Sequence, residues 1–379
     1  MASPKRTFAA GVATATLSGK AVYVAEGDYS WAIDDYVFVS VYGGYEPIGW
    51  TRDIPSQMTR LVIPGGDAGL IASTLQNIPI VLEGLTIVGE AVLDGSPPDT
   101  LTSYLVLFAD LAVISQDRIL AGGSSRWARA LDAWGPTLVV NSEIGIEGFV
   151  PETSDDLAST VMADRLLVLV NSTVRGGSTT TPNVTSYGIY AGDLMSVITV
   201  INSLVTGGSV PGPRGRTAAI YAAGVKVFPP FVTVANSIID SGQSARAGGF
   251  HLMVPWFMLL LNSDVWGAAL TCYYDMILDF GIPMCLRQPG QLNRPPVVWT
   301  QAFDNISADP LLAGDGIHLL DGSSCIDAGF DLMTYPDLWL PWSQIYGIDL
   351  AQLISQDIDG DPRPQDWGWD IGPDEWVPR

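Results

Sequence analysis

The side chains that could carry out acid–base chemistry are few in this chain. Cleaving an acidic sugar by elimination needs a base near the proton to be removed and a cation that neutralises the neighbouring carboxylate. The bases with an unusual placement are His251, one of two histidines, and Lys226. Asp155 and Asp156 form a carboxylate pair, but they stand in a variable loop with no histidine or lysine nearby in the sequence. We therefore interpret the pair as solvated loop acids.

One cationic segment has a motif-like spacing and contains Arg287, Pro289 and Arg294. Pectate lyases of one large group carry Arg-x-Pro-x-x-Arg, and here the second arginine comes two residues later than in that motif. Their Trp-Ile-Asp-His segment is missing from the sequence, as are the motifs of polygalacturonases. An enzyme that acts on acidic polysaccharide, a lyase or a glycoside hydrolase, is therefore our alternative hypothesis, and we assign no catalytic residue.

Three ring-bearing residues take equivalent places in successive repeats. Tyr190, Tyr221 and His251 close the segments GIY, AIY and GFH, in which the preceding apolar residue points inward. Successive strand residues face opposite sides, so the three rings would form one outward column, one ring per coil and about 4.8 Å apart. They are our candidate ligand-binding residues, as a platform for sugar rings. The simpler interpretation, which we favour, is a stacking ladder that stabilises the sheet.

The element that must position these rings is a recurring phrase: an apolar run, then Asn-Ser, then a short run that closes on glycine. Its asparagines lie 26 to 34 residues apart, and such a period is typical of repeat proteins. Asparagine tolerates the left-handed backbone of a sharp corner, and its amide could bond to the asparagine of the next coil. We predict a structural ladder of Asn141, Asn171, Asn202, Asn236 and Asn262.

This phrase predicts an all-β fold, a right-handed parallel β-helix with one coil per repeat and a continuous core of Val, Ile and Leu. A helical solenoid would need 3.6-residue periodicity, and a βαβ repeat would need an amphipathic helix in every period; neither is visible. We expect the β-helix over residues 1–300, with a capping helix at about residues 3–18. The last coils and a C-terminal cap would follow over residues 301–379 in the same continuous domain.

Composition restricts the partners. The formal charge is −22, with 40 acidic side chains against 18 basic ones, which disfavours binding to nucleic acid. The longest apolar run, residues 252–261, has about half the length of a membrane span, so we expect none. The N-terminus lacks the apolar core of an export signal. Cys272 and Cys285 could pair if the protein is exported, and Cys325 would be a small buried residue.

The apolar stretch that begins at His251 is too long to face only inward. Either residues 330–356, with Trp339 and Trp342, cover the outer face, or a partner does, such as another copy of the chain. His318, in contrast, is expected to be a partly buried strand residue.

Near the C-terminus, four charged residues could form a closing cluster in which an arginine fork bridges carboxylates. They are Asp357, Arg363, Asp370 and Glu375. The alternating acids that begin at Asp357 also look like part of a calcium loop, without its full spacing or its distal glutamate. We therefore predict no metal and no cofactor, with calcium as the alternative.

The closing sequence resembles that of bacterial right-handed β-helix proteins of the choice-of-anchor Q type, and the opening residues are similar to the first coils of that family. Ser324-Cys325 and Pro373 depart from its pattern. The resemblance implies an extracellular or cell-surface location, and we expect no anchor segment after Trp376. The matching residues are Asp309, Pro310, Leu319, Ser324, Ile326, Asp327, Gly329, Asp357, Gly360, Arg363, Asp370, Ile371, Gly372 and Glu375.

Together these features favour a secreted or surface-displayed structural or adhesive β-helix that is not an enzyme. Its partners would be a polysaccharide or copies of itself.

Overall fold

The structure, a computed structural model, describes most of the chain. The described residues are 5–31, 36–63, 68–73, 78–89, 103–108, 110–123, 127–151, 156–192, 196–222, 231–252, 257–267, 271–273, 284–286, 293 and 300–377. Lys226, Asp155 and the segment with Arg287 and Arg294 lie outside them.

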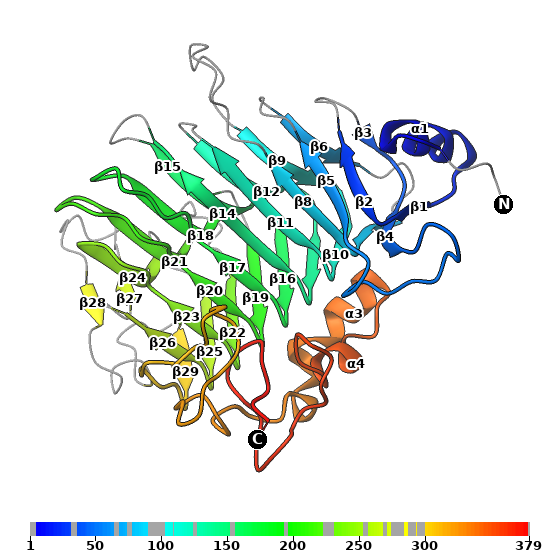
Figure 1. Cartoon of the computed structure of the whole chain (residues 1–379). Coiled ribbons are helices and arrows are strands. Elements are labelled where there is room, and N and C mark those ends of the chain that lie inside the picture. The colour runs from blue at the N-terminus through cyan, green and yellow to red at the C-terminus, as the bar shows by residue number, and fades with distance from the viewer. Residues whose placement is uncertain are drawn as a thin grey trace.

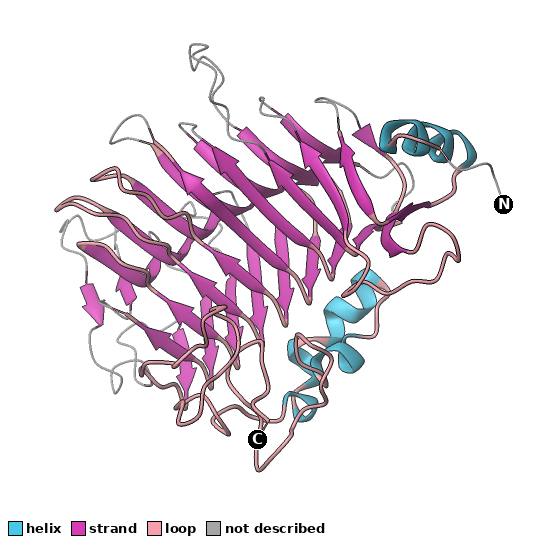
Figure 2. Ribbon diagram, in the orientation of Figure 1, coloured by secondary structure: helices cyan, strands magenta, loops and turns pink. Residues whose placement is uncertain are grey.

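The strands wind into a parallel β-solenoid with three faces, named here sheets A, B and C (Figures 1 and 2). Sheet A contains β1 (Val22–Ala25), β4 (Val41–Tyr45), β7 (Ile80–Glu83), β10 (Ala112–Ser115), β13 (Thr137–Val140), β16 (Leu166–Val170), β19 (Val197–Ile201), β22 (Phe231–Ala235), β25 (Phe257–Leu261) and β29 (Thr300–Phe303). Sheet B contains β2 (Gly27–Ser30), β5 (Thr59–Ile63), β8 (Leu85–Gly89), β11 (Arg118–Gly123), β14 (Glu143–Phe149), β17 (Thr173–Arg175), β20 (Leu204–Thr206), β23 (Ile238–Asp240) and β26 (Asp264–Trp266).

Sheet C contains β3 (Tyr36–Val37), β6 (Ala68–Ala72), β9 (Ser103–Phe108), β12 (Trp127–Ala133), β15 (Leu157–Ala163), β18 (Thr185–Ala191), β21 (Arg216–Ala222), β24 (Arg246–Leu252), β27 (Thr271–Tyr273) and β28 (Met284–Leu286). Neighbouring strands in all three sheets pair in parallel, except that β27 and β28 are antiparallel. The predicted parallel β-helix is thus confirmed.

Stacked apolar side chains fill the inside of the coil. On sheet A, for example, Val139, Leu169, Val200 and Val234 are register partners on successive strands, and all four are buried. Burying each such side chain contributes roughly 1.5–3 kcal/mol. The repeated core position is what makes an apolar run recur in every period.

The helix α1 (Phe8–Ser18) lies at the N-terminal end of the solenoid, as predicted (Figure 1). The hydroxyl of Thr7 accepts a hydrogen bond from the N–H of Ala10 and caps its first turn. Phe8 is buried and packs edge-on against the ring of Trp31, with 4.9 Å between ring centroids. The helix thus covers the core where the first coil has no neighbour. None of the helices in the described ranges is long and apolar enough to span a membrane.

The recurring asparagines form the corners between sheets A and B. Asn141, Asn171, Asn202, Asn236 and Asn262 all have left-handed backbone angles, with φ between 38° and 47°. Asparagine is one of the few residues that adopt this conformation at low cost.

The side-chain hydrogen bonds from coil to coil at these corners are made by the serines that follow, where we predicted an asparagine ladder. Each serine hydroxyl accepts a backbone N–H from the preceding coil and donates to the carbonyl two residues before it in its own coil. The N–H donors and their acceptors are Asp117 to Ser142, Ser142 to Ser172, Ser172 to Ser203, Ser203 to Ser237 and Ser237 to Ser263, at 3.1–3.2 Å.

The asparagine amides bond instead to residues near the C-terminus. Asn171 donates to the carbonyls of Leu353 and Gln356 at 2.7 and 2.8 Å. The amides of the next three corners donate to the carbonyls of three further residues of this segment: Asn202 to Ile354, Asn236 to Phe330 and Asn262 to Ala328. Residues 328–356, called here the return segment, are thereby bound along four successive corners.

The return segment covers the outer face of sheet A with η1 (Leu332–Thr334), η2 (Pro336–Leu338), α3 (Leu340–Tyr346) and α4 (Leu350–Ile354) (Figures 1 and 2). Leu332, Tyr346 and Leu350 are buried against apolar side chains such as Val140 and Val168. Trp339 and Trp342 are partly buried against the same cluster. Of the two alternatives for the apolar outer face, cover by the chain itself is therefore observed on sheet A.

Candidate functional site

The predicted closing residues meet at the C-terminal cap. The buried guanidinium of Arg363 forms an ion pair with Glu375, with 2.8 Å between Nη1 and Oε2. It also donates to the carbonyl of Gly372 at 2.9 Å. The carboxylate of Asp370 accepts the N–H groups of Asp327 and Trp376, each at 2.7 Å. Every one of these bonds joins segments of the cap, which supports a structural role.

Asp357 organises a turn. Its Oδ1 accepts the N–H groups of Asp359 and Asp361 at 2.9 and 2.8 Å, and its Oδ2 accepts the N–H of Glu375 at 3.2 Å. These carboxylate oxygens therefore face backbone donors, as in a turn held by an aspartate side chain. Burial raises the pKa of Asp357, that of Asp370 to about 6 and that of Glu375 to about 7.

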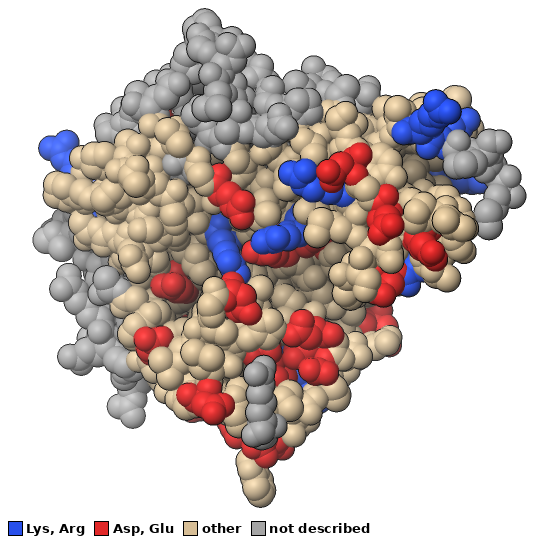
Figure 3. Space-filling model, in the orientation of Figure 1, with Lys and Arg blue, Asp and Glu red and all other residues tan. Residues whose placement is uncertain are grey.

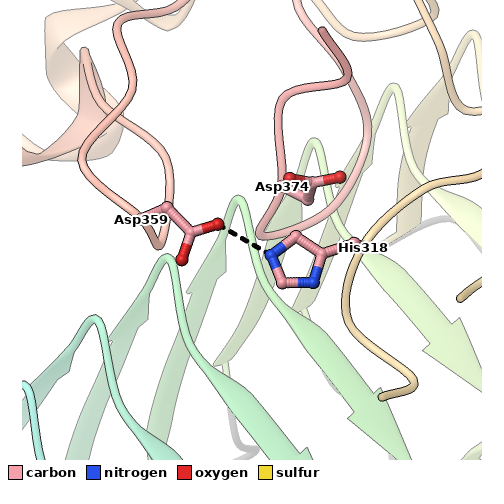
Figure 4. Close-up of side chains that lie close together, drawn as sticks. All are labelled: His318, Asp359 and Asp374. Atoms are coloured by element: carbon pink, nitrogen blue, oxygen red, sulfur yellow. Dashed lines mark hydrogen bonds and ion pairs between the residues drawn. The ribbon is translucent and has the colours of Figure 1, made fainter. Parts of the chain in front are cut away.

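His318 lies in a loop of the same cap, where we predicted a strand. Its ring nitrogens contact two carboxylates. Nδ1 lies 2.6 Å from Asp315 Oδ2. Nε2 lies 2.7 Å from Asp359 Oδ2 (Figure 4). The carboxylate of Asp374 lies beside the same ring. Partial burial disfavours the charged imidazole, but the hydrogen bonds to Asp315 and Asp359 outweigh it and raise the pKa of His318 to about 9.

The aromatic column lies on the outer face of sheet C. Register places Tyr190 opposite Tyr221 and Tyr221 opposite His251. The two tyrosine rings are stacked, with centroids 5.0 Å apart and 12° between their planes. Tyr187, which we did not predict, also stacks on Tyr221 at 4.5 Å because its register partner on β21 is the small Ala218.

His251 is 2% exposed, and Tyr187 meets it edge-on at 6.5 Å. Burial first, and then the charge of Arg216, lower the pKa of His251 to about 4. Its imidazole is therefore neutral near pH 7. The faces of Tyr190 and Tyr221 contact each other, so a ligand would approach their edges, and a binding role for the column stays a prediction.

A row of polar side chains on the outer face of sheet B was not predicted. Asp28, Arg60, Thr86, Arg118 and Glu143 are register partners on five successive strands. Arg118 and Glu143 form an ion pair at 2.7 Å, and the Arg118 side chain is still 51% exposed. We call these five residues and Arg175 the polar stripe.

Arg175 joins the polar stripe to the cap. Its guanidinium lies 3.7 Å from Glu143 and donates to the carbonyl of Asp315 at 2.6 Å. Farther along sheet B, apolar residues such as Leu204 and Ile238 are buried under Ile371 of the cap. Figure 3 shows this face, with Lys or Arg and Asp or Glu side chains adjacent across its middle and mainly acidic ones below.

Comparison with protein-family models, curated proteins and solved structures gave no match. The parallel β-solenoid is established by the strand pairing alone, and the resemblance to the choice-of-anchor Q type stays a prediction.

The remaining predictions concern Asp156 and the cysteines. Asp156 is 1% exposed, so the expectation of a solvated loop acid is wrong for this residue; the chain enters β15 directly after it. Cys325 is buried, as predicted, and its Sγ lies 3.6 Å from Asp264 Oδ2. The backbones of Cys272 and Cys285 are direct register partners in the antiparallel pair of β27 and β28.

Proposed function

We propose that the chain is a non-catalytic, exported adhesive solenoid that binds a linear glycan along the polar stripe. The observation that carries this proposal is the register of the stripe, which provides one polar side chain per coil on the part of sheet B next to the cap. Neighbouring strands lie about 4.8 Å apart, so the stripe offers evenly spaced contacts to an extended polymer.

The side chains of the stripe suit a sugar. Arginine and carboxylate groups present paired donors and acceptors that can bind adjacent hydroxyl groups. Val62 and Val88, which are register partners and partly exposed, lie beside them on the same face. Such a pair can contact the apolar face of a sugar ring, as ligand sites commonly combine apolar area with a few placed polar groups.

The non-catalytic part of the proposal is supported by His251. This imidazole, one of the two bases we considered from the sequence, is 2% exposed and enclosed beside the tyrosine rings, so it is not placed to reach a polymer. Export to the cell surface rests on the sequence resemblance.

The test is binding of neutral and uronate-containing polysaccharides to the full chain, first by pull-down and then by calorimetry. We expect Arg118→Ala to weaken binding at least tenfold, whereas Arg214→Ala, at an exposed loop position, should leave it unchanged. Equal binding by both variants and the parent would refute a site on the stripe. Release of unsaturated product, read by its absorbance near 235 nm, would favour the lyase alternative.

Self-association is the second candidate, because Phe231 and Phe257 stack on the outer edge of sheet A and remain 47% and 38% exposed. Their ring centroids lie 4.8 Å apart. Sedimentation over a range of concentrations tests it: a dimer that Phe257→Ser dissociates supports this candidate, and a monomer at all concentrations contradicts it.

A further inference from the structure

Three segments of the C-terminal cap bring possible metal ligands together. His318 comes from the loop after β29, Asp359 from the turn held by Asp357, and Asp374 from the last residues of the chain (Figure 4). One ligand atom of each residue lies within 4.8 Å of those of the other two. Since these residues are far apart in the sequence, only the closed cap assembles them.

The imidazole is already oriented for coordination. Its Nδ1 contacts Asp315 Oδ2 at 2.6 Å, which leaves Nε2 directed at Asp359. Asp315 is itself fixed, because its Oδ1 accepts the N–H of Ile317 at 2.8 Å and its carbonyl accepts the guanidinium of Arg175 at 2.6 Å. A carboxylate on the second ring nitrogen is the usual partner of a metal-bound histidine, since it fixes the ring and raises its basicity.

Asp374 is the independent indication of a ligand. It is 6% exposed, and its Oδ2 accepts the N–H of Leu319 at 2.7 Å. Its other oxygen accepts no hydrogen bond from the described residues and is not sealed from solvent, so it is free to coordinate an ion. A cation between Asp374, His318 and Asp359 would satisfy that oxygen.

We propose that His318 Nε2, Asp359 and Asp374 bind a divalent first-row transition-metal ion such as Zn²⁺, with Asp315 as a positioning residue. Zinc binds histidine nitrogen and carboxylate oxygen at about 2.0–2.2 Å. A histidine ligand favours such ions over Ca²⁺ and Mg²⁺, which prefer oxygen ligands alone. Three protein ligands leave a fourth position for water.

Binding exchanges one proton for the ion. The proton on Nε2 that His318 shares with Asp359 is released, the nitrogen lone pair coordinates the metal, and both carboxylates bind as anions. Without an ion, His318 instead bridges Asp315 and Asp359 as an imidazolium, and the experiment must separate these two arrangements.

The experiment uses the full chain without a histidine tag, stripped with EDTA and titrated with ZnCl₂ by calorimetry. We expect one Zn²⁺ per chain, at least 100-fold weaker binding in His318→Gln or Asp359→Asn, and about 10–100-fold weaker binding in Asp315→Asn. His251→Gln is the matched control and should bind like the parent. CaCl₂ should bind more weakly than ZnCl₂.

A second readout does not depend on how well the variants fold. With only two histidines in the chain, ¹⁵N NMR of the imidazoles resolves both. Zinc should shift the Nε2 resonance of His318 and leave both resonances of His251 unchanged. No shift at His318, or zinc affinity that is unchanged in both His318→Gln and Asp359→Asn, would overturn the proposal and leave the imidazolium bridge.

Discussion

The side-chain amide of Asn236 pairs with the backbone of Phe330, 94 residues later in the chain. Its Nδ2 donates to the Phe330 carbonyl at 2.8 Å, and its Oδ1 accepts the Phe330 N–H at 3.0 Å. The same asparagine forms a left-handed corner with φ of 45°. One side chain thus turns a coil and holds the return segment.

Separating these two roles gives the first prediction. Asn236→Gly keeps the left-handed corner and removes both bonds, so we expect it to lower the free energy of unfolding by about 1–3 kcal/mol. Asn236→Ala should cost about 1–2 kcal/mol more, because alanine disfavours that backbone conformation. Urea unfolding measures both. Asn141→Gly is the control, since no bond from Asn141 to the return segment is present in the described structure. Equal stability of Asn236→Gly and the parent would contradict the anchoring role.

The serine ladder gives the second prediction. Ser203 Oγ accepts the N–H of Ser172 at 3.1 Å and donates to the carbonyl of Ile201 at 2.7 Å, both in a buried setting. Ser203→Ala leaves a buried donor without its partner, which should lower the free energy of unfolding by about 1–3 kcal/mol. The exposed Ser56 is the matched site, and Ser56→Ala should change stability by less than about 0.5 kcal/mol. Similar effects at both sites would show that the ladder does not stabilise the stack.

Substitution of Asp264 by asparagine should stabilise the protein. Asp264 is fully buried near Cys325 and, through burial first and then the charges of Asp240 and Asp309, its pKa is raised from 3.8 to about 6. Between those pH values the folded protein binds more protons than the unfolded chain, so its contribution to stability falls as the pH rises. We expect Asp264→Asn to be more stable than the parent at pH 7.5, by about 2–3 kcal/mol, and to lose this advantage near pH 4. Urea unfolding at both pH values measures this difference. If the variant is less stable than the parent at pH 7.5, the buried carboxylate of Asp264 does not destabilise the fold.

The contribution of His251 to stability should change with pH in the opposite direction. The pKa of His251 falls from 6.5 in the unfolded chain to about 4 in the folded protein, so the unfolded chain binds the additional proton between these values. The stability contributed by His251 is complete above pH 6.5 and is lost as the pH falls toward 4. In His251→Phe this part of the pH dependence should disappear, whatever the substitution does at pH 7. Thermal unfolding from pH 4 to pH 7 measures the slope, and an unchanged slope would show that the imidazole is not shielded.

The coil could be predicted from the sequence because each of its corners and strands is determined by residues that are close together in the chain. The recurring Asn-Ser phrase predicts a corner at Asn202 or Asn236 without knowledge of any distant residue. The equivalent GIY, AIY and GFH segments likewise predict which rings meet on sheet C. Register between successive coils follows from the repeat, and burial of one face fixes it.

The part of sheet B under the cap has a partial signal in the same phrase. The residues directly after the corner serines are register partners on sheet B: Glu143, Thr173, Leu204, Ile238 and Asp264, and all of them except Glu143 are buried. The apolar pair Leu204 and Ile238 lies under Ile371 of the cap. The apolar residues at these two positions therefore indicate part of the area that the cap covers, whereas the polar Thr173 and Asp264 do not.

The contacts of the cap could not be predicted in this way. Asp359 meets His318 across 41 residues, and Asn171 meets Gln356 across 185 residues. Neither pair belongs to a repeat, so no periodicity relates them. Their meeting depends on how irregular segments pack, which a local pattern does not encode.

The return segment changes how this stack should respond to force and to synthesis. In a plain solenoid each coil contacts only its neighbours, so coils can be lost one at a time from an end. Here residues 328–356 bind the corners at Asn171, Asn202, Asn236 and Asn262 together. A pull on the last coils is therefore shared by four coils at once. On the ribosome the coils emerge before the return segment, so a nascent chain stacks its coils before their corners are bound together.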